Sequence, residues 1–475
     1  MAGSRKSSRS RAGRPDLVSR VSVQLSHVVA PADRLVVGLS GGIDSVALLD
    51  CLLRCARRLH IRVAALHVNH QLSAHAGRWS AFCRQLCRAR RVPFRSVKVH
   101  VARGDSVEAA ARDARYEVFR REDADFVALA HHQDDQVETV LLQLLRGAGL
   151  RGLAAMPLVR IEDRGSRIGR PQRRGFEREL NPQSSILNPR ILRPLLDVTR
   201  SEILEYARAR KLEWVEDESN ADVQFARNFL RHKVLPVIGE RFPGYRGTIA
   251  RAARHLADAA AVLDEVAAAD GAESLADATL ATEALRSLPA ARARNLLRYF
   301  LSAHRVANPG AERLAEALRQ LLAAKQDARV CIELGDASLR RFNGRAYLVR
   351  AFRTPRPGFS RRWRGERQLS VPELQGLLRM DRGRGHGISV ARLGGRPVTV
   401  RVRGGGERLQ PDCKRPRRSL KNLLQEVQLP PWERERLALL FCGEHLVWAP
   451  GIGVDCAFQA GHDERALRPV WVPVA

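Results

Sequence analysis

The stretch from Leu35 to Ser45, LVVGLSGGIDS, constrains the fold of this chain more than any other part of the sequence. Its first half is a short apolar run rich in β-branched residues, which is typical of a strand buried on both faces. The run ends at Ser40-Gly41-Gly42, where glycine permits backbone conformations and close approaches that a Cβ would forbid. Val46 then opens an apolar helical pattern. A strand, a tight turn and a helix N-terminus direct unpaired N–H groups toward one point, which predicts a phosphate-binding loop.

Two hydroxyl groups and a carboxylate surround the glycines of this loop. Ser40 and Ser45 supply donors, and Asp44 is suited to hold a water molecule or Mg²⁺ beside phosphates. The loop is not a Walker A motif, and it lacks the GxGxxG spacing of dinucleotide-binding folds. SGGIDS instead resembles the pyrophosphate loop of ATP pyrophosphatases, enzymes that split ATP between the α and β phosphates. An ordinary strand–turn–helix, in which the glycines serve geometry alone, is the alternative.

Length, charge and cysteine content narrow the class of protein. A chain of 475 residues predicts about three domains. The net charge of +30, from 81 Lys and Arg against 51 Asp and Glu, favours a polyanionic partner, although an arginine-preferring genome would also raise it. No apolar run of about twenty residues exists, so we expect no membrane span. Eight scattered cysteines without a signal peptide predict reduced thiols in a cytoplasmic protein.

Strand and helix patterns alternate between residues 31 and 220. This alternation predicts an α/β fold with a doubly wound parallel sheet, in which ligands gather at the carboxyl ends of the strands. Polar side chains follow two of these strands, in His67-Val68-Asn69-His70 and in His131-His132-Gln133-Asp134-Asp135. We expect both loops to converge with SGGIDS on one rim. Strands are expected at 35–39, 61–67, 94–99 and 126–130, and helices at 46–59, 78–90, 106–122 and 135–145.

Charged residues near this rim are candidates for the chemistry. Asp134, Asp135 and Glu138 gather at a helix N-terminus, where they either cap the helix or, with His132, hold Mg²⁺, orient a base or take a proton. Adjacent histidines with oxygen donors and no nearby cysteine make a poor zinc site. Arg112 and Arg115 share a helical face, and either at least one of them contacts ATP or both are simply solvated. Arg227 and Arg231 also share a helical face, for which a solvated pair is the alternative to a functional role.

The remaining chain divides by composition. Residues 1–30 read as a disordered basic tail, 160–190 as an insertion, and 356–395 as an Arg-, Gly- and Pro-rich linker. Residues 31–225 form the loop-bearing domain and 226–355 a helical domain with a small β-meander, turned at Asn343-Gly344. We expect core stripes in that domain and buried thiols on two helices of the first domain. The stripe residues are Leu256, Leu263, Val266, Leu314, Leu318 and Leu321, and the thiols are Cys51, Cys55, Cys83 and Cys87.

The last domain, residues 396–475, is predicted to be small, basic and α/β. A basic cluster lies beside its glycine-rich loop and in front of an apolar helical face. It is either a docking site for an RNA backbone or a solvated run of charge. The cluster comprises Lys414, Arg415, Arg417, Arg418 and Lys421, and the apolar face comprises Leu420, Leu423 and Leu424.

Several motifs together resemble those of the tRNA(Ile)-lysidine synthetase family. They are SGGIDS, HVNH, AHHQDDQVETVLLQLLRGAGLRGL, ILRPLL, DESN…RNFLR and GGERL…RRSLKNLLQE…PPWERE…VWAPGIGVD. The resemblance covers most of residues 31–240 and 398–456 and is weak between 246 and 395. AHHQDDQVET and RRSLKN are its specific elements, because SGGxDS alone indicates only the superfamily.

This resemblance implies a reaction and its participants. ATP would adenylate the C2 oxygen of the wobble cytidine in a CAU-anticodon tRNA(Ile), and L-lysine would then displace AMP to form lysidine. The expected cofactors are ATP and Mg²⁺, and the expected location is the cytoplasm. The resemblance assigns ATP binding to Ser40, Gly41, Gly42, Ile43, Asp44, Ser45, Arg112 and Arg227, and catalysis to Asp44, His132, Asp135 and Glu138. It assigns tRNA binding to Lys414, Arg415, Arg417, Arg418 and Lys421, with the helical domain contacting the tRNA body.

Two other functions stay open at this point. A tRNA 2-thiolating enzyme uses the same loop but needs reactive cysteines, which the CxxxC spacing here does not supply. A non-catalytic RNA-binding protein, whose SGGIDS loop had lost its function, would explain the positive net charge. It would not explain why the SGGIDS and HHQDD motifs are both intact. The general base, the metal ligands and the oligomeric state, including a homodimer, are not fixed by these residues.

Overall fold

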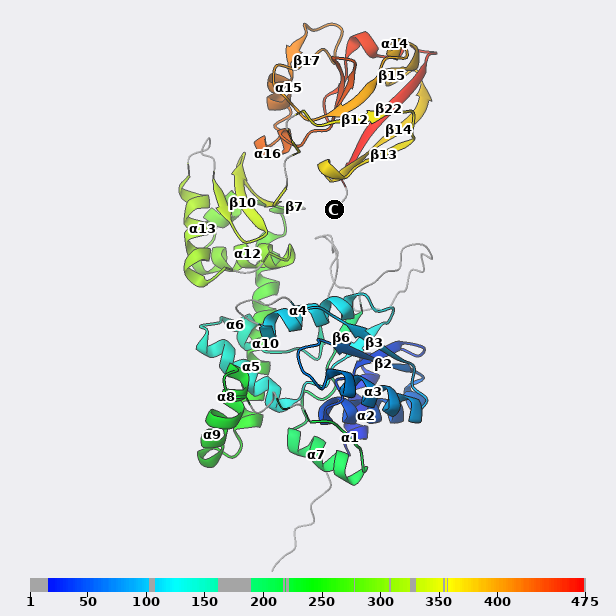
Figure 1. Ribbon diagram of the computed structural model, residues 1–475. Helices are drawn as coiled ribbons and strands as arrows, with labels where there is room; N and C mark the ends of the chain where they lie inside the picture. The colour runs from blue at the N-terminus through cyan, green and yellow to red at the C-terminus, as the bar shows by residue number, and fades with distance from the viewer. Residues whose placement is uncertain are drawn as a thin grey trace, which may run out of the picture. The chain divides into compact units, whose positions relative to one another are not determined.

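The computed structural model divides into two compact units, residues 1–266 and 267–475, which we describe separately (Figure 1). The predicted insertion lies almost wholly outside the described residues, as does part of the DESN segment. The structure describes residues 16–101, 107–160, 189–216, 218, 222–276, 278–306, 309–324, 330–352, 355–356 and 358–473.

A six-stranded sheet forms the centre of the first unit, in the order β3-β2-β1-β4-β6-β5. All neighbours pair in parallel except β5, which is antiparallel at one edge. On one side of β1 the sheet continues with β2 and then β3, and on the other side it continues with β4 and then β6. The topological switch point therefore lies between β1 and β4. The doubly wound sheet is therefore confirmed. The strands are β1 (Arg34–Gly38), β2 (Arg62–Asn69), β3 (Phe94–Lys98), β4 (Phe126–Ala128), β5 (Val159–Arg160) and β6 (Arg190–Leu192).

Helices cover both faces of this sheet. One apolar core joins the sheet to four helices, and a second, containing Tyr116 and Phe119, joins its other face to α4 (Val107–Arg120). Cys51, Cys55, Cys83 and Cys87 are buried in the first core, as predicted. The helices of that core are α1 (Leu17–Ser26), α2 (Ile43–Leu59), α3 (Ala76–Ala89) and α7 (Arg200–Ala209). The predicted capping box from Thr199 to Glu202 begins α7.

Helix α1 corrects the predicted extent of the basic tail. Asp16 caps it by accepting a hydrogen bond from the Ser19 N–H at 2.6 Å. Val21 and Leu25 are fully buried in the core that contains α2. The prediction of disorder through residue 30 is therefore wrong for residues 17–26, because Leu17, Val21 and Leu25 repeat at helical spacing and form an apolar face.

The first unit continues through helices α5 (Gln133–Leu145), α6 (Leu150–Leu153), α8 (Ala226–Phe229) and α9 (Leu235–Arg241), with a π-helix, η2 (Leu230–Val234), between the last two. Helix α10 (Tyr245–Gly271) runs across the division between the units. The predicted stripe on α10 is wrong at Leu263, which is 36% exposed, whereas the small side chains of Ala253 and Ala260 are buried.

The second unit begins with three helices and a five-stranded sheet in the order β7-β8-β11-β10-β9. Leu314, Leu318 and Leu321 are buried there, as predicted. Asn343 and Gly344 both have positive φ and turn the β10–β11 hairpin, which confirms the predicted turn. The elements are β7 (Leu275–Ala276), β8 (Thr279–Ala281), α11 (Thr282–Ser287), α12 (Ala290–Ala303), α13 (Ala311–Ala323), β9 (Cys331–Glu333), β10 (Ala337–Phe342) and β11 (Arg345–Arg350).

Most of the segment predicted as a linker, 356–395, is folded. Its strand β12 (Ser360–Trp363) pairs with β16 (Val398–Arg401), and its strand β14 (Gly376–Arg384) pairs with β22 (Arg465–Pro473). The linker prediction is wrong because buried residues such as Leu378 and Met380 alternate with outward arginines, which dominate the composition. The segment also contains β13 (Gln368–Val371), η3 (Pro372–Leu374), β15 (Ile388–Ser389) and α14 (Val390–Leu393).

Two sheets and a short ribbon make up the end of the second unit. Leu420, Leu423 and Leu424 are buried there, which confirms the apolar face predicted behind the basic cluster. The remaining elements are β17 (Arg408–Leu409), β18 (Arg418–Ser419), α15 (Leu420–Glu426), α16 (Pro431–Arg434), β19 (Leu439–Cys442), β20 (His445–Ala449), β21 (Gly453–Val454) and η4 (Cys456–Phe458). None of the described helices combines the length and apolar character that crossing a membrane would require.

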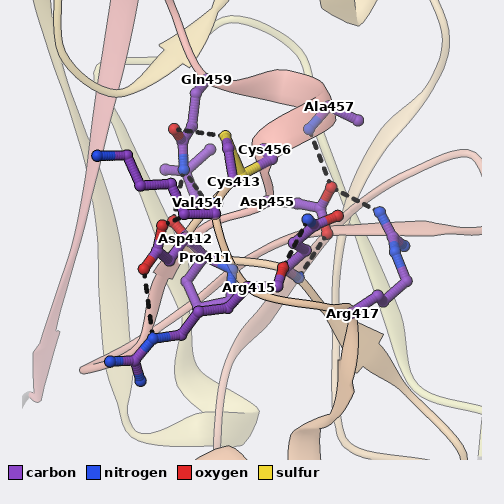
Figure 2. The surroundings of a disulfide bond; sticks show 12 residues. Pro411, Asp412, Cys413, Arg415, Arg417, Val454, Asp455, Cys456, Ala457 and Gln459 are labelled. Atoms are coloured by element: carbon purple, nitrogen blue, oxygen red, sulfur yellow. Dashed lines mark hydrogen bonds and ion pairs between the residues drawn. A yellow bond between two sulfur atoms is a disulfide. The ribbon is translucent and has the colours of Figure 1, made fainter.

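A disulfide joins Cys413 to Cys456 in this region (Figure 2). The expectation that all eight cysteines are reduced is therefore wrong for this pair. The two residues are 43 positions apart, so no spacing motif reveals that the fold brings them together. The other six cysteines are free, and of these only Cys331 is exposed.

We predict that Leu25→Ala destabilises the chain by about 2–4 kcal/mol, because it removes buried methyl groups and leaves a cavity between α1 and α2. The matched control is Val23→Ala on the same helix, where the side chain is 56% exposed and the expected change is below about 0.5 kcal/mol. Urea unfolding followed by circular dichroism measures both. Equal unfolding of the two variants would show that α1 is not part of the core.

Candidate active site and RNA-binding surface

The SGGIDS loop connects β1 to α2 at the topological switch point of the sheet. Gly41 has a φ of +94°, and a Cβ there would lie 2.9 Å from Val215 Cγ2, so conformation and space both require glycine. Ser45 Oγ donates to the Gly42 carbonyl at 2.9 Å and accepts from the Gly41 N–H at 3.2 Å. Ser40 Oγ lies 3.1 Å from Ser45 Oγ. The serines thus shape the loop, and the first turn of α2 offers N–H groups without intrahelical partners.

The loop after β4 brings an acidic cluster to the same rim. His132 is 2% exposed, and its Nε2 lies 3.8 Å from Asp44 Oδ1 and 3.6 Å from Asp135 Oδ2. Its Nδ1 lies 3.8 Å from Asp134 Oδ2. The predicted convergence is therefore confirmed for SGGIDS and the loop after β4, since Asp44 comes from the first and Asp135 from the second. From the third predicted loop, the buried His67 lies with its Nδ1 2.9 Å from the carbonyl of Leu39, directly before SGGIDS.

The two central carboxylates differ in their electrostatic environment. Burial raises the pKa of Asp44, and within the described residues its Oδ1 accepts no hydrogen bond. Burial would also raise the pKa of Asp135, but His132, His131, Arg227 and the His132 N–H, which donates to Oδ2 at 3.0 Å, hold that pKa below its usual value. Asp135 is therefore the stable anion of the pair, while Asp44 has an oxygen free for a ligand.

Glu138, one turn further along α5, is fully buried and paired with two arginines. Arg231 donates to both of its oxygens, at 2.7 Å and 3.0 Å, and Arg227 Nε lies 3.2 Å from Oε2. Arg231 also reaches Asp135 Oδ1 at 3.4 Å. Burial raises the pKa of Glu138, and the two guanidinium groups oppose that shift. With both oxygens engaged, Glu138 is placed to position α5 against α8 and η2 rather than to accept a proton.

Arg231 is a residue that our sequence-based site assignment missed. It lies on the π-helix η2, and short π-helical turns are frequent at functional sites. The available signal in the sequence was that Arg231 follows Arg227 by four residues. In the structure both guanidinium groups form ion pairs with Glu138.

A second missed residue, Arg193, is buried on the other side of the rim. It directly follows β6, is 1% exposed and donates from Nη1 to the Pro157 carbonyl at 2.9 Å. Its Nε has no hydrogen-bond partner among the residues that the structure describes, and burial lowers its pKa. The predicted Arg112 lies with its guanidinium 5.0 Å from the Tyr116 ring centroid on α4. For Arg193, the available signal in the sequence was its positive charge inside the otherwise apolar run Ile191–Leu196.

His131, next to this positive group, is neutral at physiological pH. Burial lowers the pKa of His131 to about 3; Asp135 acts in the opposite direction, whereas Arg193, Arg227 and Arg115 add to the lowering. This side of the rim therefore carries guanidinium charge beside a neutral imidazole, and it is suited to an anionic ligand.

The basic cluster of the second unit is partly neutralised by acids of its own domain. Arg417 pairs with the buried Asp455 at 2.8 Å, and Arg418 pairs with Glu426 at 2.7 Å. Arg415 lies 3.5 Å from Asp412. Lys414 and Lys421 are exposed and form no ion pair within the part of the chain that the structure describes. These two lysines are therefore the free cations of the cluster.

No group of three His, Cys, Asp or Glu side chains among the described residues is placed to hold a metal ion. The unpartnered Asp44 Oδ1 nevertheless fits Mg²⁺, which is commonly held by one or two carboxylates together with substrate phosphates.

Comparison with known proteins defines first the class of the N-terminal unit. Residues 17–238 match the family model described as a PP-loop domain, so the strand–loop–helix at Ser40–Ser45 belongs to a PP-loop enzyme. Residues 280–347 match the TilS substrate binding domain, and residues 398–471 match the TilS substrate C-terminal domain.

Curated relatives then identify the family. The tRNA(Ile)-lysidine synthase of Nitrosomonas europaea is 45% identical over 447 residues, covering 94% of this chain and 93% of the relative. The corresponding proteins of Azoarcus sp. and Coxiella burnetii are 40% and 34% identical, covering 94% and 90% of this chain and 93% and 91% of their own lengths. The chain belongs to the tRNA(Ile)-lysidine synthase family.

We predict that Arg231→Met destabilises the first unit by about 3–5 kcal/mol, because it leaves the buried Glu138 carboxylate with a single arginine. Combining it with Glu138→Gln should cost less than the sum of the single changes, with a coupling of about 0.5–3 kcal/mol. Arg208→Met, at an exposed position of α7, is the matched control. Urea unfolding gives all four values, and strictly additive costs would contradict the pairing.

Proposed function

We propose that this protein ligates L-lysine to C2 of the wobble cytidine in a CAU-anticodon tRNA(Ile), using ATP and releasing AMP and pyrophosphate. The observation that carries the proposal is the meeting of SGGIDS with the His132–Asp135 loop at the topological switch point, a common ligand site in doubly wound sheets. Membership of the lysidine synthase family supports the substrate. We expect the reaction to take place in the cytoplasm.

The first half-reaction is adenylation of the base. The cytosine C2 oxygen attacks the α phosphate, and the bond between the α and β phosphates breaks to release pyrophosphate. Ser40–Ser45 and the N-terminus of α2 would hold the leaving phosphates, and Arg112, Arg227 and the buried Arg193 would compensate their charge. Asp44 would hold Mg²⁺, which supplies charge neutralisation when it is bound.

The second half-reaction replaces AMP by lysine. The amine of lysine attacks C2, the C2–O bond to the adenylate breaks, and the amine loses a proton. Asp135, whose pKa is held low, is an anion that can hold the ammonium form of lysine close to His132, which lies 3.6 Å from it. Glu138, which we predicted as catalytic, would act by fixing Arg227 and Arg231.

The rival functions explain fewer of these contacts. Thiolation needs a reactive thiolate near the loop, yet burial raises the pKa of Cys83, the thiol beside Gly41, to about 12. A purely RNA-binding protein would not require a Gly41 without room for a Cβ or a carboxylate oxygen left free beside the loop.

The direct test follows radiolabelled lysine into a CAU-anticodon tRNA(Ile) transcript with and without ATP. We predict ATP-dependent labelling at the wobble cytidine, reduced by about 100-fold or more in Asp44→Ala, because the carboxylate that would hold Mg²⁺ beside the leaving phosphates is lost. Asp123→Ala is the matched control, since that carboxylate is 99% exposed and pairs with the surface residue Arg34. Labelling without ATP, or full labelling by Asp44→Ala, would refute this assignment.

Binding of the tRNA backbone is assigned to the free cations of the basic cluster. We predict that the double change Lys414→Ala and Lys421→Ala raises the Kd for tRNA by about threefold to tenfold and lowers the slope of log K against log salt by up to about 2. Arg34→Ala is the control, because its guanidinium already pairs with Asp123 and it begins β1, at the end of the strand opposite the SGGIDS loop. Filter binding at several salt concentrations gives both quantities. An unchanged slope would place the phosphate contacts elsewhere.

A further inference from the structure

The Cys413–Cys456 disulfide lies within the basic cluster itself (Figure 2). Cys413 directly precedes Lys414 in the loop of residues 410–417, which connects the paired strands β17 and β18. Cys456 begins η4, and the two Cα atoms are 5.5 Å apart. Cys413 is exposed and Cys456 is half-buried, so a thiol in solution can reach the bond.

The two ends of the loop are anchored independently of the disulfide. The Gln410 N–H donates to Asp455 Oδ2 at 2.9 Å, and the Cys456 N–H donates to the Gln410 carbonyl at 2.8 Å. At the other end, Arg417 pairs with Asp455 Oδ1 at 2.8 Å. Because these contacts persist without the covalent bond, the ribbon and its domain should stay folded when the disulfide is opened.

The tip of the loop, residues 412–416, depends on the disulfide. Its other hydrogen bonds among the described residues stay within the loop: the Lys414 N–H donates to Asp412 Oδ1 at 2.9 Å, and Gln410 Nε2 donates to the Arg415 carbonyl at 2.8 Å. Apart from the S–S bond, the polar contact between the tip and residues 453–459 is Gln459 Oε1, which lies 3.7 Å from Cys413 Sγ. Gln459 Nε2 also donates to the carbonyl of Pro411, just before the tip, at 2.7 Å. The covalent bond therefore adds the constraint that fixes the backbone at Cys413, directly before Lys414.

We propose that Cys413 and Cys456 form a reversible thiol–disulfide site that controls RNA binding by this loop. The proposal rests on the proposed function, in which the cluster binds the tRNA backbone. In the oxidised protein Lys414 is held ready for a phosphate, whereas in the reduced protein the tip must lose conformational freedom on binding, which weakens the complex.

The exchange is balanced by a dithiol reductant. A thiolate of the reductant attacks one sulfur of the Cys413–Cys456 bond and forms a mixed disulfide, and the second thiol of the reductant then displaces the remaining cysteine. Two electrons and two protons pass to the protein, which gains two thiols, and the reductant leaves as a disulfide. Oxidation by glutathione disulfide reverses the exchange and yields two molecules of glutathione.

The test compares the oxidised and reduced full-length protein. One sample is oxidised with glutathione disulfide, one is reduced with tris(2-carboxyethyl)phosphine, and non-reducing peptide mapping establishes the linkage. Filter binding at one salt concentration gives the Kd for the tRNA(Ile) transcript. We expect the Kd to rise by about threefold to tenfold on reduction, while the Kd for ATP stays unchanged.

Substitutions identify the bond responsible. Cys413→Ser should bind like the reduced protein in both redox states, and Cys456→Ala should do the same. Cys331→Ser, which removes the exposed free thiol, should keep the full redox response.

Three outcomes would overturn the proposal: no Cys413–Cys456 peptide after oxidation, equal tRNA affinity of the two wild-type forms, or a redox response that persists in Cys413→Ser. If the oxidised protein did not bind tRNA at all, the assigned RNA-binding role would fail and this inference with it. Equal and tight binding by both forms would refute the redox control alone.

Discussion

The buried ion pairs of Glu138 are the interactions on which the rest of the site depends. A carboxylate with no exposure to water is costly unless its oxygens are fully engaged, and here Arg231 binds both oxygens while Arg227 approaches one of them. The partners lie about ninety positions apart in sequence, on α5 and on the α8–η2 segment. Their pairing therefore fixes the start of α5, and with it Asp135 and His132, at the switch point of the sheet.

From this anchor the site divides into two electrostatic halves. Asp44 and Asp135 both approach Nε2 of His132, and their surroundings shift their pKa values in opposite directions. The other half carries guanidinium charge, including the buried Arg193 with a free Nε. Adenylation first expels a polyanion and ligation then needs an anion beside an amine, so one rim with separated charges suits both steps. A single uniform patch would favour one step and oppose the other.

The sequence predicted those parts of the fold that depend on residues close together in the chain. The apolar strand Leu35–Leu39, the helical spacing after Val46 and the Asn343-Gly344 turn each depend on near neighbours, and each was predictable. The pairing of Glu138 with Arg231 was not, because the chain between them has to fold first. The strands within 356–395 were missed because arginine-rich composition obscured the alternation of residues such as Leu378 and Met380. Helix α1 was missed because the Ser- and Arg-rich residues before it dominated the composition of the segment 1–30.

The charge that the C-terminal cluster presents to a ligand likewise depends on contacts that only the folded chain makes. Its composition indicates an RNA-binding surface of five cations, yet Arg417, Arg418 and Arg415 each face an acid of the same domain. Asp455, which neutralises Arg417, also anchors Gln410, so this ion pair holds the loop instead of binding phosphate. In the proposed RNA complex, binding by this cluster then depends on a few free ammonium groups, and each contributes fully only when the backbone that carries it is fixed in advance. A covalent bond placed directly before Lys414 meets that requirement, and no count of charges along the chain would reveal it.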